Sequence, residues 1–251
     1  MTHYDERMRI LAIDAGNSRI KWGLHEDGSW SAQGWIETAR AAGLARAWAK
    51  MPAPDAVVAS NVAGPRVARS LAGASRRWGK RVRFVRGAER QCGVTSSYDN
   101  PRQLGADRWA ALIGARHLRR DACVVVNAGT TLTADALSAD GVFLGGIIVP
   151  GLDLMRASLA RGTAGLRPRG GRFAHFPART ADAIESGAIN ALAGAIDRMQ
   201  GYLMEAGGSA PMILVSGGAA PLVAPRLSGA VEVVDNLVLE GLIRIALDQA
   251  G

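Results

Sequence analysis

The chain has few of the residues that mark several common protein classes. Its 251 residues include two cysteines, Cys92 and Cys123, too few for a disulfide framework or a cysteine metal site. The four histidines are dispersed along the sequence, which argues against a histidine metal centre. No apolar run reaches the roughly 18 residues of a membrane-spanning helix, and the short polar start has no signal-peptide core. We therefore expect a cytoplasmic protein with no membrane partner.

Lysine is also scarce, so arginine supplies nearly all of the positive charge. Only Lys21, Lys50 and Lys80 are lysines, and the net charge is +8. A basic balance of this size can accompany nucleic-acid binding. The arginines are scattered, however, and their densest groups lack interleaved aromatic residues. We therefore interpret the charge as a solvated surface and disfavour nucleic acid as a partner.

Segments with the pattern of β-strands alternate along the chain with segments that have the periodicity of α-helices, which predicts an α/β fold. Short β-type runs are followed by amphipathic helical patterns. The expected strands lie at 9–13, 20–24, 56–60, 82–85, 122–126, 131–137, 142–149, 212–215 and 231–234. The expected helices lie at 38–50, 67–78, from 105 onward, and at 152–160, 184–204 and 236–249, with loops at 92–103 and 161–177.

The strand-rich pattern restarts at Ala122, which indicates two similar domains, 1–118 and 119–251. No low-complexity linker separates them, so we expect the domains to pack closely. The apolar face of the helix at 184–204 suits either a core within the chain or a surface between two subunits.

A glycine-rich turn follows the first expected strand, in the segment Asp14-Ala15-Gly16-Asn17-Ser18. Gly16 lets backbone N–H groups approach a phosphate, and Asn17 and Ser18 add neutral donors. Asp14 is suited to bind magnesium, directly or through water. Lys21 could place its positive charge beside a phosphate. The alternative is an ordinary hairpin with a surface lysine. The segment lacks the Gly-Lys-Ser/Thr ending of a Walker loop.

Two further glycine turns follow expected strands in the second half. Asn127-Ala128-Gly129-Thr130-Thr131 repeats the first pattern and offers backbone and hydroxyl donors. Ser216-Gly217-Gly218 permits close approach of a ligand such as an adenosine, although a plain strand-to-helix turn has the same composition. Three such turns together predict a nucleotide whose phosphate chain is held between two similar halves.

The combination of motifs makes the chain similar to the type III pantothenate kinases along essentially its whole length. Gly105-Ala106-Asp107-Arg108 resembles that family's Gly-x-Asp-Arg motif, and the turns at Asp14 and Asn127 resemble its two phosphate motifs. The segments 145–151, 180–187 and 216–218 resemble later family stretches. The resemblance implies the superfamily of acetate and sugar kinases, Hsp70 and actin. It implies two actin-like, ribonuclease H-like domains with mixed sheets flanked by helices.

The same resemblance implies ATP-dependent phosphorylation of pantothenate, the first step toward coenzyme A, by a homodimer whose substrate site lies at the subunit interface. Asp107 becomes the expected catalytic base instead of a simple helix cap, and Arg108 the ligand of the pantothenate carboxylate. The implied substrate contacts also include Tyr98, Gly105, Ala106 and Thr180. The implied ATP contacts are Asp14, Gly16, Asn17, Ser18, Lys21, Gly129, Thr130, Thr131, Gly217 and Gly218, with Mg²⁺ at Asp14.

The chain departs from the family pattern at Asn127, where the family usually has an aspartate associated with a monovalent cation. Asparagine keeps one oxygen ligand and loses the charge, so a requirement for K⁺ or NH₄⁺ stays open.

Two other functions fit the same motifs. One is a kinase-like transcriptional accessory protein with weak or lost catalysis, and the other is a kinase for a sugar or short acid. The retained Asp14, Asp107 and Arg108 favour catalysis.

Overall fold

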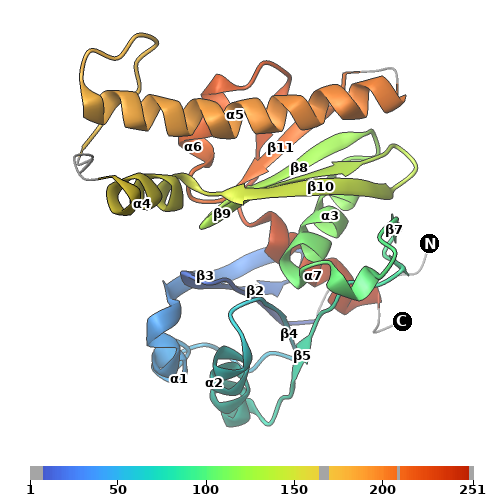
Figure 1. The fold of residues 1–251 in the computed structure, drawn as a ribbon. Helices are drawn as coiled ribbons and strands as arrows, with labels where there is room; N and C mark the ends of the chain where they lie inside the picture. Colours follow the sequence, from blue (N-terminus) through green and yellow to red (C-terminus); the bar gives the residue numbers. More distant parts are fainter. Residues whose placement is uncertain (1–7, 164–169, 208–209, 249–251) are drawn as a thin grey trace. The chain divides into compact units, whose positions relative to one another are not determined.

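The computed structural model describes residues 8–163, 170–207 and 210–248, which form two compact α/β units (Figure 1). The first unit contains the described residues up to Leu118 together with the last helix, α7 (Leu237–Asp248). The second unit is Arg119–Asn236. Among the described residues, no helix is long and apolar enough to cross a membrane.

The first unit is built on a five-stranded mixed sheet with the order β3-β2-β1-β4-β5. Its strands are β1 (Ile10–Ala15), β2 (Arg19–Glu26), β3 (Ser29–Glu37), β4 (Ala56–Asn61) and β5 (Val82–Phe84). The first three strands form an antiparallel meander, whereas β4 pairs parallel to β1 and β5 parallel to β4. The central strand β1 is almost wholly buried, as expected for its nearly continuous apolar run.

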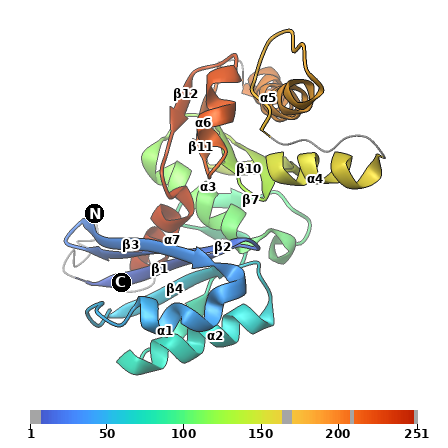
Figure 2. The same cartoon turned by 90° about the vertical axis from the view of Figure 1, so that its left-hand side faces the viewer.

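Helices cover both faces of this sheet (Figure 2). One face packs against α1 (Leu44–Ala47) and α2 (Pro65–Ser75), where Leu44, Trp48 and Leu71 fill the core. The opposite face is covered by α7 and α3 (Ala106–Leu118), which also pack tightly against each other. Glycines permit this close packing, because a Cβ at Gly241 would lie 1.7 Å from the Ala110 carbonyl oxygen.

The second unit repeats the strand order of the first. Its strands run β12-β11-β8-β9-β10, with β8–β9–β10 antiparallel and β11 and β12 parallel to β8. These are β8 (Cys123–Ala128), β9 (Thr131–Leu137), β10 (Val142–Pro150), β11 (Met212–Ser216) and β12 (Val231–Val233). The long helix α5 (Thr180–Gly207) packs its apolar stripe on this sheet, and α4 (Leu152–Gly162) and α6 (Ala220–Val223) complete the unit. Identical connectivity in both units confirms the expected pair of similar domains.

Shorter elements connect these layers. They are η1 (Thr38–Gly43), η2 (Arg76–Trp78), β6 (Arg90–Gln91), β7 (Val94–Ser96), η3 (Pro101–Gln103) and η4 (Ala224–Arg226). The strands β6 and β7 form a small hairpin in the segment that leads to α3.

The nine expected strands and most of the expected helices are present, and three assignments were wrong. The strand β3 escaped detection because it is an edge strand with alternate residues exposed, so its sequence carries no apolar run. The expected loop 92–103 contains β7 and η3, and the expected helix 38–50 is mostly a 3₁₀ helix followed by one short α-helix. Of the expected loop 161–177, residues 164–169 lie outside the described residues, and 161–162 end α4.

The division of the chain into 1–118 and 119–251 also needs a correction at its C-terminal end. The segment from Leu237 onward was expected in the second domain, but α7 belongs to the first unit. The physical reason is its apolar face: Leu242 and Ile245 are buried where α7 meets α3, β1 and β4. The apolar face of α5, by contrast, is core within its own unit, since Ile189, Leu192 and Ile196 are buried against β8 and β9.

Candidate active site

The first glycine turn joins β1 to β2 and carries Asp14 at its edge. Asp14 lies in register between Lys21 on β2 and Ser60 on β4, so these three side chains share one face of the sheet. The Ser60 hydroxyl donates a hydrogen bond of 2.7 Å to Asp14 Oδ1. The Thr38 hydroxyl donates one of 2.7 Å to the Gly16 carbonyl, and Gly16 N–H donates to the Arg19 carbonyl at 3.0 Å. The turn is therefore held in one conformation, with Asn17 and Ser18 exposed.

The carboxyl of Asp14 is an unusual acid. Its pKa is raised to about 6, mainly because the group is buried, and the negative charge of Asp107 adds to the rise. The hydrogen bond from Ser60 and the positive charge of Lys21 act in the opposite direction and lower the pKa. A carboxylate whose charge is poorly compensated attracts a cation, and oxygen donors are the ligands that Mg²⁺ prefers. The residues at Asp14 therefore fit a divalent cation.

The Gly-x-Asp-Arg segment opens helix α3 in the same unit. Asp107 lies in the first turn of the helix, where the helix dipole favours negative charge, and its Oδ1 accepts a hydrogen bond of 2.9 Å from the Arg108 N–H. A Cβ on Gly105 would lie 2.6 Å from that same oxygen, so glycine at this position makes room for the carboxylate. Because the charge of Asp107 affects the pKa of Asp14, the structure brings these two carboxylates of the first unit into one electrostatic environment.

Arg108 is buried, at 7% exposed, although its guanidinium is a strongly polar group. One of its terminal N–H groups donates to the Tyr98 hydroxyl at 3.3 Å. Tyr98 precedes η3, and its ring lies 6.0 Å from the guanidinium carbon. The structure therefore brings Tyr98 to Arg108, which follows it by ten positions and is the neighbour of Asp107.

The second glycine turn joins β8 to β9 and is enclosed by two other segments of its unit. Gly129 N–H donates to the Thr131 carbonyl, and the Thr130 carbonyl accepts from Gly151 N–H, both at 3.0 Å. A Cβ on Gly151 would lie 2.2 Å from the Gly129 carbonyl oxygen. Gly217 follows β11 with φ +104°, and a Cβ there would lie 2.5 Å from the Ala128 carbonyl oxygen. Three backbone segments thus meet at this turn, and only glycine permits the approach at two of them.

Asn127 occupies in the second unit the position that Asp14 occupies in the first. It pairs with Ser216 on β11 in the same register in which Asp14 pairs with Ser60 on β4. On the other side it pairs with Thr133, where Asp14 pairs with Lys21. The duplicated fold therefore presents a carboxylate in one unit and an amide in the other.

The remaining expected residue of the site, Thr180, is exposed at the first position of α5 in the second unit. Sequence reasoning missed Ser60 and Thr38, which fix Asp14 and Gly16. Ser60 ends an expected strand with a polar residue, and that polar ending was the available signal. The role of Gly151 was also missed, although the Pro150-Gly151 pair marks a turn.

A duplicated sheet with a glycine turn after the first strand of each unit is the arrangement of the actin-like folds. Within this class, the chain belongs to the type III pantothenate kinase family, whose model matches residues 10–201. It is 47% identical over 237 residues to the type III pantothenate kinase of Nitrosospira multiformis, covering 94% of this chain and 90% of that protein. It is 49% identical over 241 residues to the enzyme of Aromatoleum aromaticum, covering 96% and 99%.

Solved structures support the fold at much lower sequence identity. A Campylobacter jejuni protein, provisionally described as a Baf family transcriptional activator, superposes with a TM-score of 0.60 at 18% identity, covering 96% of this chain and 98% of that one. A Sinorhizobium meliloti protein, provisionally described as a 2-dehydro-3-deoxygalactonokinase, gives the same values. These likenesses establish the actin-like architecture.

Proposed function

We propose that this protein transfers the γ-phosphoryl group of ATP to the hydroxyl of pantothenate and so forms 4'-phosphopantothenate, the first step of coenzyme A biosynthesis. Membership of the type III pantothenate kinase family supports the substrate and the reaction. The observation that carries the residue roles is the pair of carboxylates, Asp14 and Asp107, which lie in one unit, where the charge of Asp107 raises the pKa of Asp14.

In this proposal Asp107 is the catalytic base. Its carboxylate stands in the first turn of α3, oriented by the Arg108 N–H, and can hold the acceptor hydroxyl and take its proton. Phosphoryl transfer depends mainly on positioning and on neutralising charge, so the base has a modest chemical task. Arg108 binds the pantothenate carboxylate through its planar guanidinium, and the Tyr98 hydroxyl orients that guanidinium. Gly105, Ala106 and Thr180 complete the proposed substrate contacts.

The ATP phosphates are assigned to the two glycine turns. In the first unit the contacts are Gly16, Asn17, Ser18 and Lys21. In the second unit they are Gly129, Thr130 and Thr131. The remaining ATP contacts, Gly217 and Gly218 of the third glycine turn, are assigned to the adenosine. We assign Mg²⁺ to Asp14, directly or through water; when bound, this ion neutralises charge on the transferred phosphoryl group. A monovalent cation at Asn127 is the weakest assignment, because the amide supplies one oxygen without charge.

The proposal extends to the assembly and the cellular location. We assign the protein to the cytoplasm and to a homodimer whose interface contributes to substrate binding. Of the other candidate functions, no specific observation favours a transcriptional accessory protein, since the likeness to a protein so described is confined to the fold.

An ADP-release assay with the purified protein, ATP, Mg²⁺ and pantothenate tests the proposal. We expect turnover that depends on pantothenate, measured in parallel with potassium, ammonium or sodium as the counterion. A sugar or a short hydroxy acid in place of pantothenate serves as the acceptor control. Absence of pantothenate-dependent ADP release in all three salts would overturn the proposed activity.

A further inference from the structure

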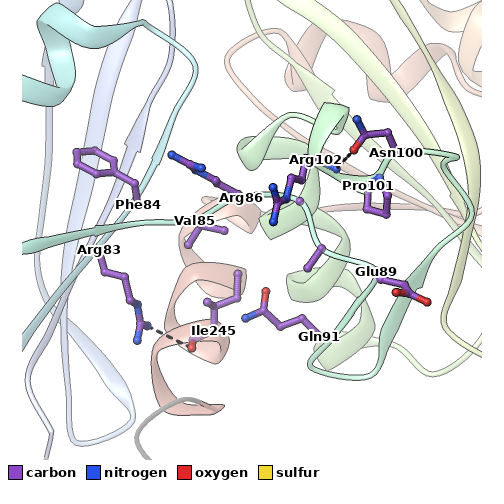
Figure 3. Close-up of a pocket in the computed structure, with 12 residues that line it drawn as sticks. Arg83, Phe84, Val85, Arg86, Glu89, Gln91, Asn100, Pro101, Arg102 and Ile245 are labelled. Carbon is purple, nitrogen blue, oxygen red and sulfur yellow. Dashed lines mark hydrogen bonds between the residues drawn. The ribbon is translucent and has the colours of Figure 1, made fainter.

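A cavity of about 810 Å³ opens in the first unit. Its walls come from the end of β5 and the segment that follows it, from η3, and from the last turn of α7 (Figure 3). Apolar surface comes from the half-buried Pro101, and the buried Val85 and Ile245 lie beneath the wall. None of the residues that line it is among the proposed ATP or pantothenate contacts.

Positive charge predominates in this cavity. Arg83, Arg86 and Arg102 line it together with a single carboxylate, Glu89. Within the described residues, none of the three arginines forms an ion pair with a carboxylate. Three guanidinium groups around one concave surface, with one acidic residue, create a positive potential that an anion would relieve.

Arg83 is the most confined of the three. It is half-buried, and one terminal N–H group donates to the Ile245 carbonyl at 3.3 Å, as Figure 3 shows. Burial lowers the pKa of its guanidinium, and no carboxylate opposes that effect. Its contact with a carbonyl near the end of α7 uses one of five N–H donors, so most of its hydrogen-bonding capacity is available to a ligand.

The walls of the cavity are fixed by close backbone packing. A Cβ on Gly87 would lie 2.2 Å from the Pro101 carbonyl oxygen and 3.0 Å from that of Leu104, so the segment after β5 lies directly against η3. The Asn100 side chain caps η3 by accepting a hydrogen bond of 3.1 Å from the Arg102 N–H. The cavity is therefore formed before any ligand arrives, which reduces the entropy lost on binding.

We propose that this cavity is a second ligand site and that it binds a small organic phosphate. Its volume falls within the range of about 300–1,000 Å³ that is usual for small-molecule sites. Guanidinium groups match phosphate oxygens in pairs, which compact ammonium groups do not. The half-buried ring of Pro101 offers apolar contact to the organic part of the molecule.

Phenyl phosphate, which joins a phosphate to an apolar ring, is a suitable probe for isothermal titration calorimetry. The full chain is titrated without ATP or pantothenate, so the result does not depend on the proposed kinase activity. In the double variant Arg86→Ser/Arg102→Ser we expect the dissociation constant to rise at least about tenfold. Both side chains are exposed, so the substitutions should not disturb folding, which the tryptophan fluorescence spectrum checks.

Arg81→Ser is the matched control, because Arg81 is an exposed arginine directly before β5 that does not line the cavity. Its dissociation constant should match that of the wild type. Phenyl phosphate should also protect Arg102 from modification by p-hydroxyphenylglyoxal, measured by peptide mass spectrometry. Equal affinity in all three proteins, or no saturable binding to the wild type below about 10 mM, would refute the second site.

Discussion

Replacing Asp14 with asparagine is expected to stabilise the ligand-free protein at pH 8 while removing its kinase activity. Burial and the charge of Asp107 raise the pKa of Asp14 to about 6 from an ordinary value of 3.8. Ionising this group is therefore harder in the folded chain than in the unfolded chain. Asparagine has nearly the shape of the protonated carboxyl group, and its side-chain oxygen can still accept the Ser60 hydrogen bond.

The sign and size of the effect follow from proton linkage. Between about pH 4 and pH 6 the folded state binds more protons than the unfolded state, so stability falls as the pH rises through this range. Above pH 6 the penalty is complete, and a difference of about 2 pKa units corresponds to about 3 kcal/mol. Since asparagine also leaves a polar group partly buried, about 3 kcal/mol is the upper limit of the gain from Asp14→Asn.

Urea unfolding followed by tryptophan fluorescence measures the free energy of unfolding of the unit that contains Asp14. All six tryptophans lie in the first unit, as does Asp14, so the signal reports on that unit alone. The free energy of unfolding should be higher in Asp14→Asn than in the wild type at pH 8, and the difference should vanish near pH 4. Asp99→Asn, which changes an exposed carboxylate of the same unit, is the control and should show no such trend.

Two results would refute this reasoning. One is a lower stability of Asp14→Asn than of the wild type at pH 8. The other is a difference in stability between the two proteins that stays constant between pH 8 and pH 4. If the raised pKa of Asp14 causes the difference, it must shrink as Asp14 becomes protonated. Mg²⁺ with ATP should stabilise the wild type and have a smaller effect on the variant, as expected for a lost metal ligand.

Three further predictions concern catalysis and cation use. Asp107→Asn should lower kcat by about 10²–10⁴-fold with the fold intact, and full activity in the ADP-release assay would disprove its role as the base. Gly217→Ala should raise the KM for ATP and lower the Tm, because its Cβ would meet the Ala128 carbonyl. Gly201→Ala in α5, where a Cβ would meet no other atom within 4 Å, is the control and should neither raise the KM nor lower the Tm; equal effects in the two variants would contradict this explanation. Asn127→Asp should make activity depend more steeply on K⁺ or NH₄⁺, measured by titrating each salt, and an unchanged salt profile would argue against a cation at this residue.

The sequence predicted those strands whose signal lies within a short run of consecutive residues. The buried runs before Asp14, Asn127 and Ser216 predicted β1, β8 and β11, because a nearly continuous apolar run bounded by glycine favours a buried strand. The strand β3 was not predicted, since its alternating exposure gives no apolar run, and its pairing with β2 is a tertiary interaction. The placement of α7 was missed for a similar reason: its apolar face does not say against which sheet it packs.

The sequence by itself determined the α/β class, the family, and the residue types that carry phosphate and acid–base chemistry, since these depend on short motifs such as Gly105 to Arg108. Only the tertiary structure decided that Ser60 holds Asp14, that Asp107 changes the acidity of Asp14, and that Asn127 pairs with Ser216 as Asp14 pairs with Ser60. Strand register and burial create these relations between residues far apart in the chain, and a pKa depends on the charges and solvent around a group. No local pattern contains that information.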